Sequence, residues 1–365
     1  MKERIPLSII LPHIDQLKPY AVGAATTHNE TAVRLHLNEN PYPPSERVLD
    51  ALHSIGERLV RRYPDNQNGM LRSALARHYG RSEAEIFCGN GSSEIISLLF
   101  KAFLGPDRRI AIPDPSFALY QTVASIHRTA CEMIPNLEDL SVDADALIRS
   151  TADAAVLINP HAPSGKLLPL AEVERIVKRY QGLLIIDEAY IDFCSDVHGA
   201  SPTALPLLDK YPNLIILRTF SKSYAMCGMR VGYCFANPAL IGALNKAKDL
   251  YNIDQVSAVL AAAALSDKAY LKQTTAAIRR TKDAFSAAMT GMGFRVYPSD
   301  TNFVLCATPA SLGVDGARSL CARLAERNVY VRHSDSHRLR DKLRISIGTD
   351  AEMDALVKEL SQLLG

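Results

Sequence analysis

Short apolar segments alternate with longer segments of helical period between about residues 85 and 250. The apolar segments are rich in β-branched side chains and are bounded by polar or turn-forming residues, which is typical of buried strands. We predict strands over residues 85–88, 109–112, 130–134, 154–159, 183–187, 214–218 and 230–235. Helical periodicity fills most of the intervals between them. This order predicts an α/β core, in which helices cover a parallel sheet.

The pattern changes after about residue 254. Residues 256–292 are helical and rich in alanine, which predicts a long connecting helix. The tail then offers strands at 302–306, 329–332 and 343–347 and helices at 316–327 and 351–364. We therefore expect an N-terminal arm that belongs to the small domain, a large α/β domain, the connecting helix and a small C-terminal α+β domain, over residues 1–37, 38–255, 256–292 and 293–365.

Composition places the chain among ordinary globular proteins. Of its 365 residues, 47% are hydrophobic and 22% are charged, which argues against a disordered, collagen-like or disulfide-scaffold protein. The 41 basic and 39 acidic residues leave a net charge of +2 without long runs of one sign, so we expect no nucleic acid or anionic membrane as a partner. The partner is expected to be a small molecule.

Two further features bear on location. The apolar run Val256–Leu265 is about half the length that a membrane crossing needs, and prolines at 6 and 12 interrupt the apolar N-terminal stretch, which favours a structured arm over a secretory leader. The seven cysteines are odd in number and scattered, without a C-x-x-C pair. This usage predicts reduced thiols, a cytoplasmic location and no metal site.

Candidate chemistry gathers at the predicted strand ends, where ligands bind in open parallel sheets. Gly91, Ser92 and Ser93 open a helix after the first strand, and such a helix start binds phosphate or is simply capped by serine. A dinucleotide fingerprint is disfavoured, because Glu94 stands where its third glycine would be. A P-loop is excluded as well, because the pair Gly165-Lys166 lacks the earlier glycine and the following hydroxyl.

Three charged residues define the expected reaction. Asp187 ends an apolar strand, and a buried carboxylate needs a cationic partner, which a protonated pyridine nitrogen would provide. Lys222 follows another apolar strand, and it either reaches solvent or loses its charge by forming an imine. Arg230, with Thr219 and Ser221, would add a guanidinium and hydroxyls to the phosphate site.

Asn159-Pro160, Asp187-x-x-Tyr190, Ser221-Lys222 and Arg230 stand in an order and spacing that resembles the fold-type I pyridoxal-phosphate (PLP) aminotransferases. The chain is most similar to the histidinol-phosphate aminotransferase branch. The motifs that carry this likeness are HLNENP at 36–41, RYPD at 62–65, GNGSSE at 89–94, DEAY at 187–190 and LRISIG at 343–348. The resemblance implies a mostly parallel, seven-stranded sheet beside a smaller α+β domain.

The resemblance also implies a set of cofactor contacts. Lys222 would bind PLP covalently and act as the catalytic base, Asp187 would pair with the ring nitrogen, and Asn159 and Tyr190 would hydrogen-bond the ring oxygen. The phosphate would be held by Gly91, Ser92, Ser93, Thr219, Ser221 and Arg230, with Tyr63 reaching across from the second subunit of a homodimer. No metal is implied.

For substrates, the resemblance implies an amino donor and a 2-oxo acid. Arg344 is the expected carboxylate clamp, and Arg332, Tyr20 and Asn38 are further candidate contacts. For Arg332, a structural ion pair is an equally good interpretation.

Two departures from the family pattern leave the substrate open. Phe117 stands where the family often has a tyrosine stacked on the ring, and the loop from Asn159 to Gly165 reads NPHAPSG rather than NPNNPTG. An aromatic amino-acid aminotransferase and a phosphothreonine decarboxylase remain alternatives within the enzymes. A catalytically silent PLP-binding regulatory protein is the alternative outside them.

Overall fold

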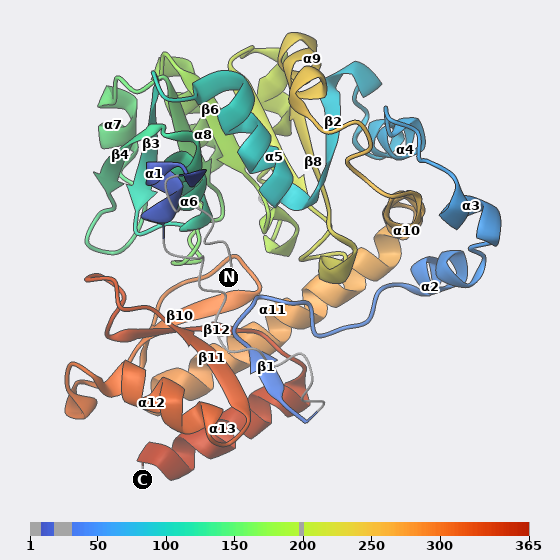
Figure 1. Cartoon of the computed structure of the whole chain (residues 1–365). Coiled ribbons are helices and arrows are strands. Elements are labelled where there is room, and N and C mark those ends of the chain that lie inside the picture. Colours follow the sequence, from blue (N-terminus) through green and yellow to red (C-terminus); the bar gives the residue numbers. More distant parts are fainter. Residues whose placement is uncertain (1–8, 18–30, 197–200, 365) are drawn as a thin grey trace, which may run out of the picture.

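Two sheets joined by helices make up the fold in the computed structural model, which describes residues 9–17, 31–196 and 201–364 (Figure 1). The large sheet and its helices form one layered unit, and the small sheet forms a second unit with α12 (Gly316–Ala325) and α13 (Asp350–Leu364). In Figure 1 the helix α11 (Lys268–Gly291) runs from the first unit to the second.

The large sheet has seven strands in the order β2-β8-β7-β6-β5-β3-β4, and β8 alone runs antiparallel to its neighbours. The strands are β2 (Ile86–Asn90), β3 (Arg109–Asp114), β4 (Ala130–Pro135), β5 (Ala154–Ile158), β6 (Leu183–Asp187), β7 (Leu214–Thr219) and β8 (Val231–Ala236). The prediction of a mostly parallel, seven-stranded α/β sheet is therefore confirmed.

The central strands are apolar along their whole length because both faces of the sheet are covered. Every residue of β5 is buried, and successive residues belong alternately to two hydrophobic clusters, with Val156 in one and Leu157 in the other. This burial on both faces is the property that produces continuous apolar runs in parallel sheets.

Helices cover the sheet by presenting one apolar face. In α8 (Leu170–Arg179), for example, Val173, Ile176 and Val177 are buried at spacings of three and four residues. The other helices beside the large sheet are α4 (Gly69–Tyr79), α5 (Gly91–Leu99), α6 (Leu119–His127), α7 (Ala144–Arg149) and α9 (Pro238–Ala247). The shorter α2 (Glu46–His53) and α3 (Glu57–Arg61) extend to one side of it (Figure 1).

The single connecting helix expected over 256–292 is two helices, so that prediction was wrong in this detail. The first is α10 (Gln255–Leu265), and the chain leaves the helical path at Ser266 and Asp267 before α11 begins. Asp267 then accepts a hydrogen bond from the backbone N–H of Tyr270 at 3.1 Å, which caps the new helix. Alanine-rich periodicity does not reveal such a break.

The small sheet has the order β1-β11-β12-β10-β9 and includes a strand from the N-terminal segment. Its strands are β1 (Val33–Leu35), β9 (Arg295–Val296), β10 (Phe303–Ala307), β11 (Val329–His333) and β12 (Lys342–Ser346). β1 pairs with β11 in parallel, Val33 opposite Val329. The sequence predicted the three longer strands but not β1 and β9, because two or three residues show no periodicity.

Short turns complete the described chain. They are α1 (Pro12–Asp15), the 3₁₀ segments η2 (Glu83–Glu85), η4 (Ile191–Phe193), η5 (Leu205–Asp209), η6 (Cys227–Met229) and η7 (Ala310–Leu312), and the π-helical segment η3 (Phe100–Leu104).

Candidate active site

The carboxyl ends of β5, β6 and β7 lie at one edge of the large sheet. Asp187, the last residue of β6, is opposite Ile158 of β5 and Leu217 of β7. The backbone N–H of Asn159 donates to the carbonyl of Asp187 at 2.9 Å. The predicted residues at these three strand ends therefore gather in one place.

Asp187 is buried, with 4% of its surface exposed, and its carboxylate has two partners. The hydroxyl of Tyr120 donates to Oδ2 at 2.8 Å, and the backbone N–H of Ala189 donates to Oδ1 at 3.1 Å. Burial raises the pKa of Asp187 to about 6, and the Tyr120 bond opposes that rise. The carboxylate is thus held in place, and none of the described residues forms an ion pair with it.

Tyr120 is a site residue that the sequence analysis missed. It is the second residue of α6, the helix that follows β3, and is fully buried. Burial and the Asp187 charge raise the pKa of its hydroxyl well above its usual range, so Tyr120 is a donor at neutral pH. A buried tyrosine requires a hydrogen-bond partner, but the sequence gives no indication which one.

The predicted phosphate contacts lie around the start of α5. Gly91 has φ +73°, and a Cβ there would come within 2.4 Å of the Arg230 Nη2 atom, so this glycine leaves the space that the guanidinium occupies. Arg230 Nη1 also donates to Ser221 Oγ at 3.3 Å, and the Ser221 N–H donates to Thr219 Oγ1 at 3.1 Å. The helix start, the hydroxyls and the guanidinium thus lie together, and groups of these kinds are common ligands of anions.

Ser92 and Ser93 occupy the first turn of α5 as predicted, and β8 passes close to them. A Cβ on Gly232 would lie 2.3 Å from the Ser92 nitrogen. Glu94 turns back and accepts hydrogen bonds from the Asn90 N–H at 2.6 Å and from Asn252 at 3.0 Å. These bonds account for Glu94 by a structural role.

Lys222 follows β7 and is partly buried. Its Nζ atom donates to the carbonyl oxygens of Leu37 and Asn38 at 3.0 and 3.1 Å and lies 5.8 Å from the centre of the Tyr190 ring. The Asn38 amide donates to the Tyr190 hydroxyl at 3.0 Å, and its Oδ1 accepts from Ser346 Oγ at 2.9 Å. Lys222, Tyr190 and Asn38 thus meet, and Ser346 of β12 is an unpredicted member of this group.

Asn159 is at the expected strand end, but its side chain is bound to its own loop. Its Oδ1 accepts from the Leu168 N–H at 2.8 Å and its Nδ2 donates to the Leu168 carbonyl at 3.1 Å. These bonds close the loop 159–168, and the expected contact with a ring oxygen stays a prediction.

The unusual loop residue His161 is buried. Its Nδ1 is 2.8 Å from Ser164 Oγ, and burial lowers its pKa to about 4. His161 is therefore neutral at physiological pH and adds no charge to the loop.

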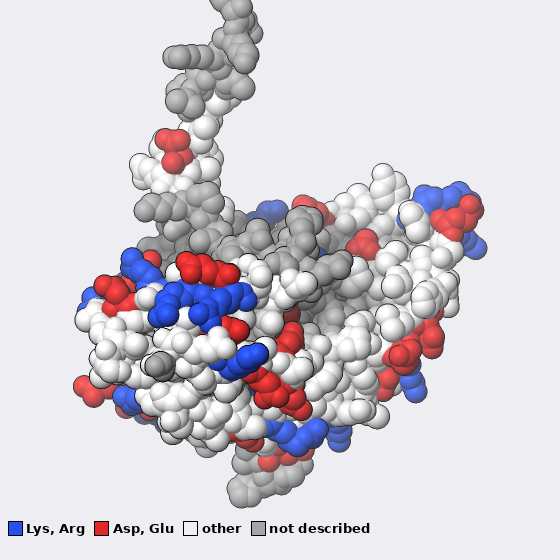
Figure 2. All heavy atoms as spheres, turned by 90° about the horizontal axis from the view of Figure 1, so that it is seen from below, with Lys and Arg blue, Asp and Glu red and all other residues white. Residues whose placement is uncertain are grey.

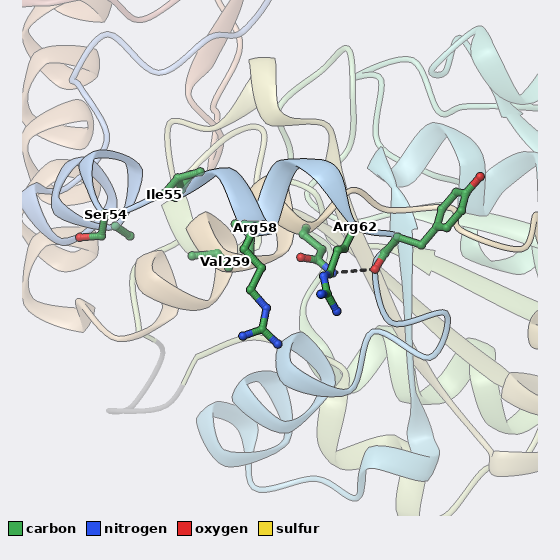
Figure 3. A pocket seen from close by; sticks show the side chains of 10 residues that line it. Ser54, Ile55, Arg58, Arg62 and Val259 are labelled. Atoms are coloured by element: carbon green, nitrogen blue, oxygen red, sulfur yellow. Dashed lines mark hydrogen bonds between the residues drawn. The ribbon is translucent and has the colours of Figure 1, made fainter.

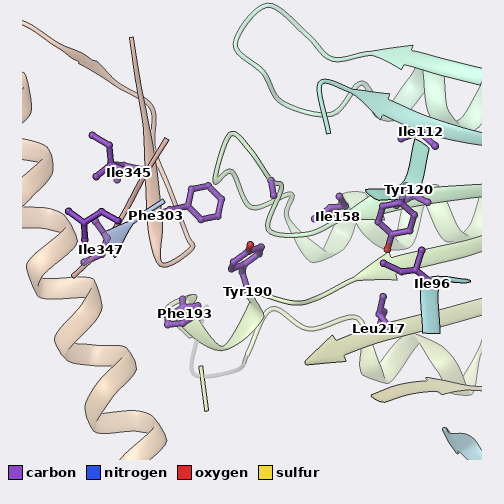
Figure 4. Close-up of a cluster of buried hydrophobic side chains, with 14 of the residues drawn as sticks. Ile96, Ile112, Tyr120, Ile158, Tyr190, Phe193, Leu217, Phe303, Ile345 and Ile347 are labelled. Carbon is purple, nitrogen blue, oxygen red and sulfur yellow. The ribbon is translucent and has the colours of Figure 1, made fainter. Parts of the chain in front are cut away.

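Aromatic rings form one wall between the two sheets (Figure 4). Phe303 of β10 contacts Tyr190 edge to face, with ring centres 5.2 Å apart, and Figure 4 shows Tyr190 between this small-sheet residue and two residues of the large unit, Tyr120 of α6 and Ile158 of β5. Phe117 packs against Tyr120 at 6.3 Å. The predicted stacking residue is therefore beside the Asp187 pair.

The two candidate clamp arginines are neighbours, with Arg332 of β11 opposite Arg344 of β12. Arg344 lies 5.5 Å from the Phe303 ring and donates to the carbonyl of His36 at 2.8 Å. Through Phe303, Arg344 reaches the wall that holds Tyr190. Tyr20 lies outside the described residues.

Tyr63 is 79% exposed. It stacks on Tyr251 with ring centres 4.7 Å apart, beside a surface hollow of about 720 Å³ (Figure 3). The hollow is lined by residues of α2, α3 and α10, among them Arg58, Arg62 and Val259. Within this chain Tyr63 does not reach the site.

The described residues contain neither of two other kinds of site. Among them, none of the helices is long and apolar enough to cross a membrane, and His, Cys, Asp and Glu form no metal-binding cluster. On the face shown in Figure 2, basic and acidic side chains lie in small mixed groups. The described surface in this view has no broad patch of one sign.

Comparison with known proteins gives consistent results over the full chain. The family model "Aminotransferase class I and II" matches residues 30–360. Histidinol-phosphate aminotransferase 1 of Burkholderia pseudomallei is 40% identical over 361 residues, which cover 96% of this chain and 97% of that protein. The crystal structure of histidinol-phosphate aminotransferase from Sinorhizobium meliloti in complex with pyridoxal-5'-phosphate has a TM-score of 0.89 at 28% identity and covers 98% of both chains.

A second activity occurs on a similar fold. A decarboxylase from Sulfurospirillum multivorans has a TM-score of 0.77 at 27% identity, and the match covers 90% of this chain and 94% of that one. Structural similarity alone therefore does not separate the two reactions.

Proposed function

The chain belongs to the class I and II aminotransferase family, and from this premise we propose that it is a PLP-dependent histidinol-phosphate aminotransferase. The reaction would transfer the amino group of L-histidinol phosphate to 2-oxoglutarate, giving imidazole-acetol phosphate and L-glutamate. The observation that carries the proposal is the identity of up to 40% over nearly the full chain to relatives of that name.

The residues present fit both the ring nitrogen and the phosphate group of PLP. Asp187 is buried without a cation, and a protonated ring nitrogen would supply one. For the phosphate group, Gly91, Ser221 and Arg230 lie together and would supply backbone, hydroxyl and guanidinium donors. Lys222 would bind the aldehyde carbon between them.

When bound, PLP supplies an electron-withdrawing ring that accepts the electron pair left on the substrate Cα. Asp187 would keep the ring nitrogen protonated, and the Tyr120 hydrogen bond fixes the orientation of its carboxylate. Tyr190 is held by Asn38 with its hydroxyl in the site. Asp187 and Tyr190, held by Tyr120 and Asn38, would orient the ring before any proton moves.

Lys222 is the residue that moves the proton. Its amine, once released from the cofactor, would take the proton from Cα as a general base and return it to the neighbouring cofactor carbon as a general acid. The same amine serves the return reaction with the 2-oxo acid, so both substrates use one site in turn.

The substrates carry different anions, a phosphate on histidinol phosphate and carboxylates on glutamate. Arginine suits both, because its planar guanidinium binds either group through two hydrogen bonds. We assign this role to Arg344, which lies beside Phe303, with Arg332 on the next strand as the second candidate. Asn38 and Tyr20 remain proposed substrate contacts.

We further propose a homodimer, in which Tyr63 contacts the phosphate site of the second subunit. In support, Tyr63 and Val60 are 79% and 71% exposed, and Tyr251, on which Tyr63 stacks, is exposed as well. We also propose a cytoplasmic location, since all seven cysteines are free thiols.

A panel of amino donors tests the proposed activity. Purified protein loaded with PLP is assayed with histidinol phosphate, phenylalanine, tyrosine and phosphothreonine, each with and without 2-oxoglutarate. We expect the highest kcat/KM for histidinol phosphate, only with 2-oxoglutarate, and no turnover by Lys222→Ala. Faster turnover of phenylalanine or tyrosine, CO₂ release from phosphothreonine, or no turnover at all would establish one of the alternatives instead.

A further inference from the structure

A buried ion pair adjoins the proposed site, because Glu188 directly follows Asp187 in the chain. Arg218 of β7 and Glu188, which follows β6, have 5% and 1% of their side chains exposed. Arg218 donates to Glu188 Oε2 from Nη2 at 2.7 Å and from Nε at 3.0 Å. Glu188 Oε1 accepts a further bond from the Ala204 N–H at 2.6 Å. A buried pair with this many bonds is fixed in position, because losing either partner would leave a buried charge.

The tyrosines Tyr79 and Tyr233 enclose the Arg218 guanidinium further. The Tyr79 ring lies 5.1 Å from the Arg218 guanidinium carbon, and the Tyr79 hydroxyl is 3.2 Å from Nη1. Tyr79 is in turn hydrogen-bonded to Tyr233 of β8 at 2.6 Å. The guanidinium is therefore enclosed by neighbours from several elements, which makes it a rigid reference point between β6 and β7.

Asp192 joins this pair to the loop that carries Lys222. It lies on η4 between the buried residues Ile191 and Phe193, and Phe193 is labelled in Figure 4. Its Oδ1 is 3.7 Å from Arg218 Nη1, and its Oδ2 accepts a hydrogen bond from Ser223 Oγ at 2.6 Å. Ser223 is the residue directly after Lys222.

The backbone of the same two residues is held from the opposite side. The amide of Asn40 donates to the carbonyl oxygens of Lys222 and Ser223 at 3.1 and 3.0 Å. The lysine side chain is long and flexible, so the place where its amine can act depends on where its backbone is held. Asp192 and Asn40 together fix that backbone.

We propose that Asp192 and Ser223 are positioning residues for Lys222, through a hydrogen bond that anchors the lysine backbone to the buried Arg218–Glu188 pair. This inference rests on the proposed function, in which Lys222 joins PLP. Neither side chain touches the cofactor in this proposal. Their effect is on the reach of the amine, so they alter the covalent step and leave the phosphate site intact.

Two cofactor forms separate these effects. PLP can form the covalent link, whereas pyridoxamine 5'-phosphate has no aldehyde and binds only through its ring and phosphate. We would measure the rate of imine formation by stopped-flow absorbance after mixing apo-protein with PLP, and the dissociation constant of pyridoxamine 5'-phosphate by fluorescence. The variants are Ser223→Ala and Asp192→Asn. Ser150→Ala is the matched control, because Ser150 Oγ donates to Glu132 at 2.9 Å far from the site.

We expect imine formation to slow about tenfold in both test variants, with binding of pyridoxamine 5'-phosphate and the melting temperature of the apo-protein close to wild type. Ser223→Thr, which keeps the hydroxyl, should recover most of the rate. Unchanged imine formation in both variants would overturn the proposal, as would an equal loss of pyridoxamine 5'-phosphate binding, which indicates general damage. A wild-type protein that forms no imine would instead refute the proposed function.

Discussion

Tyr120 donates its hydroxyl hydrogen bond to Asp187 Oδ2 over 2.8 Å, and both side chains are buried. This bond connects α6 with the end of β6. It favours the ionised form of a carboxylate whose pKa burial has raised to about 6. An ionised Asp187 is what a protonated ring nitrogen needs as its partner.

Removing the Tyr120 hydroxyl should weaken PLP binding. Tyr120→Phe leaves the ring but takes away a hydrogen bond to a charged group, an interaction of about 1.5–3 kcal/mol. We therefore expect the dissociation constant of PLP to rise by roughly ten- to a hundredfold. Tyr180→Phe is the control, because Tyr180 is an equally buried tyrosine whose hydroxyl donates to the Ala152 carbonyl at 2.6 Å. Equal effects of the two substitutions on PLP affinity would contradict a specific role of Tyr120.

The raised pKa of Asp187 makes apo-protein stability depend on pH. The unfolded chain ionises this carboxyl from about pH 3.8, whereas the folded chain does so only near pH 6, so the apo-protein loses stability as pH rises through this window. Above pH 6 the loss is constant at roughly 3 kcal/mol, from a shift of about two units.

Asp187→Asn removes this titration. The new amide changes stability by a similar amount at every pH, so the informative quantity is the trend. Measured by urea unfolding of the apo-proteins, the stability of the variant relative to wild type should increase by roughly 2.5 kcal/mol between pH 4 and pH 8, because a small part of the wild-type loss has already occurred at pH 4. A difference that does not vary with pH would show that Asp187 titrates normally.

A methyl group at Gly91 should displace Arg230. Gly91→Ala puts a Cβ within 2.4 Å of Nη2 and imposes strain at φ +73°. Gly80→Ala imposes similar strain at φ +66°, but nothing lies within 4 Å of its Cβ. By equilibrium dialysis, we expect PLP affinity to fall at least about tenfold for Gly91→Ala, since a charge-assisted bond to the phosphate is lost. For Gly80→Ala we expect little change, and an equal fall in both would assign the effect to backbone strain alone.

The proposed dimer surface is tested by charging it. Val60→Asp places a carboxylate on α3, three residues before Tyr63, where a second subunit would bury it. We expect light scattering to show a monomer whose PLP affinity is reduced, because Tyr63 of the partner is lost. Val314→Asp, at a position 61% exposed on the small-sheet unit, should leave the dimer intact. A wild-type protein that is already monomeric would refute the dimer.

The sequence predicted the large sheet well because its central strands are buried on both faces. Runs such as 154–158 and 214–219 are apolar throughout, so their type and extent follow from local composition. The reversed direction of β8, the two-residue β9 and the break before Asp267 were not predictable. Each depends on contacts between segments far apart in the chain, or on a single capping residue.

The candidate site shows the same division. Asp187, Lys222 and Arg230 could be identified because a charged residue at the end of an apolar strand is unusual. Tyr120 could not, because its partner is 67 positions away. The partner of Asn159 was also hidden: the sequence placed the residue at a strand end, but only the folded loop brings Leu168 to its amide.

The covalent role of Lys222 is the central claim, and borohydride reduction tests it most directly. Protein loaded with PLP is reduced, digested and analysed by mass spectrometry, with Lys222→Ala treated in parallel. The account predicts the reduced cofactor on the peptide that contains Lys222, and no adduct in the variant. An adduct on a different lysine, or no adduct on the wild-type protein, would contradict it.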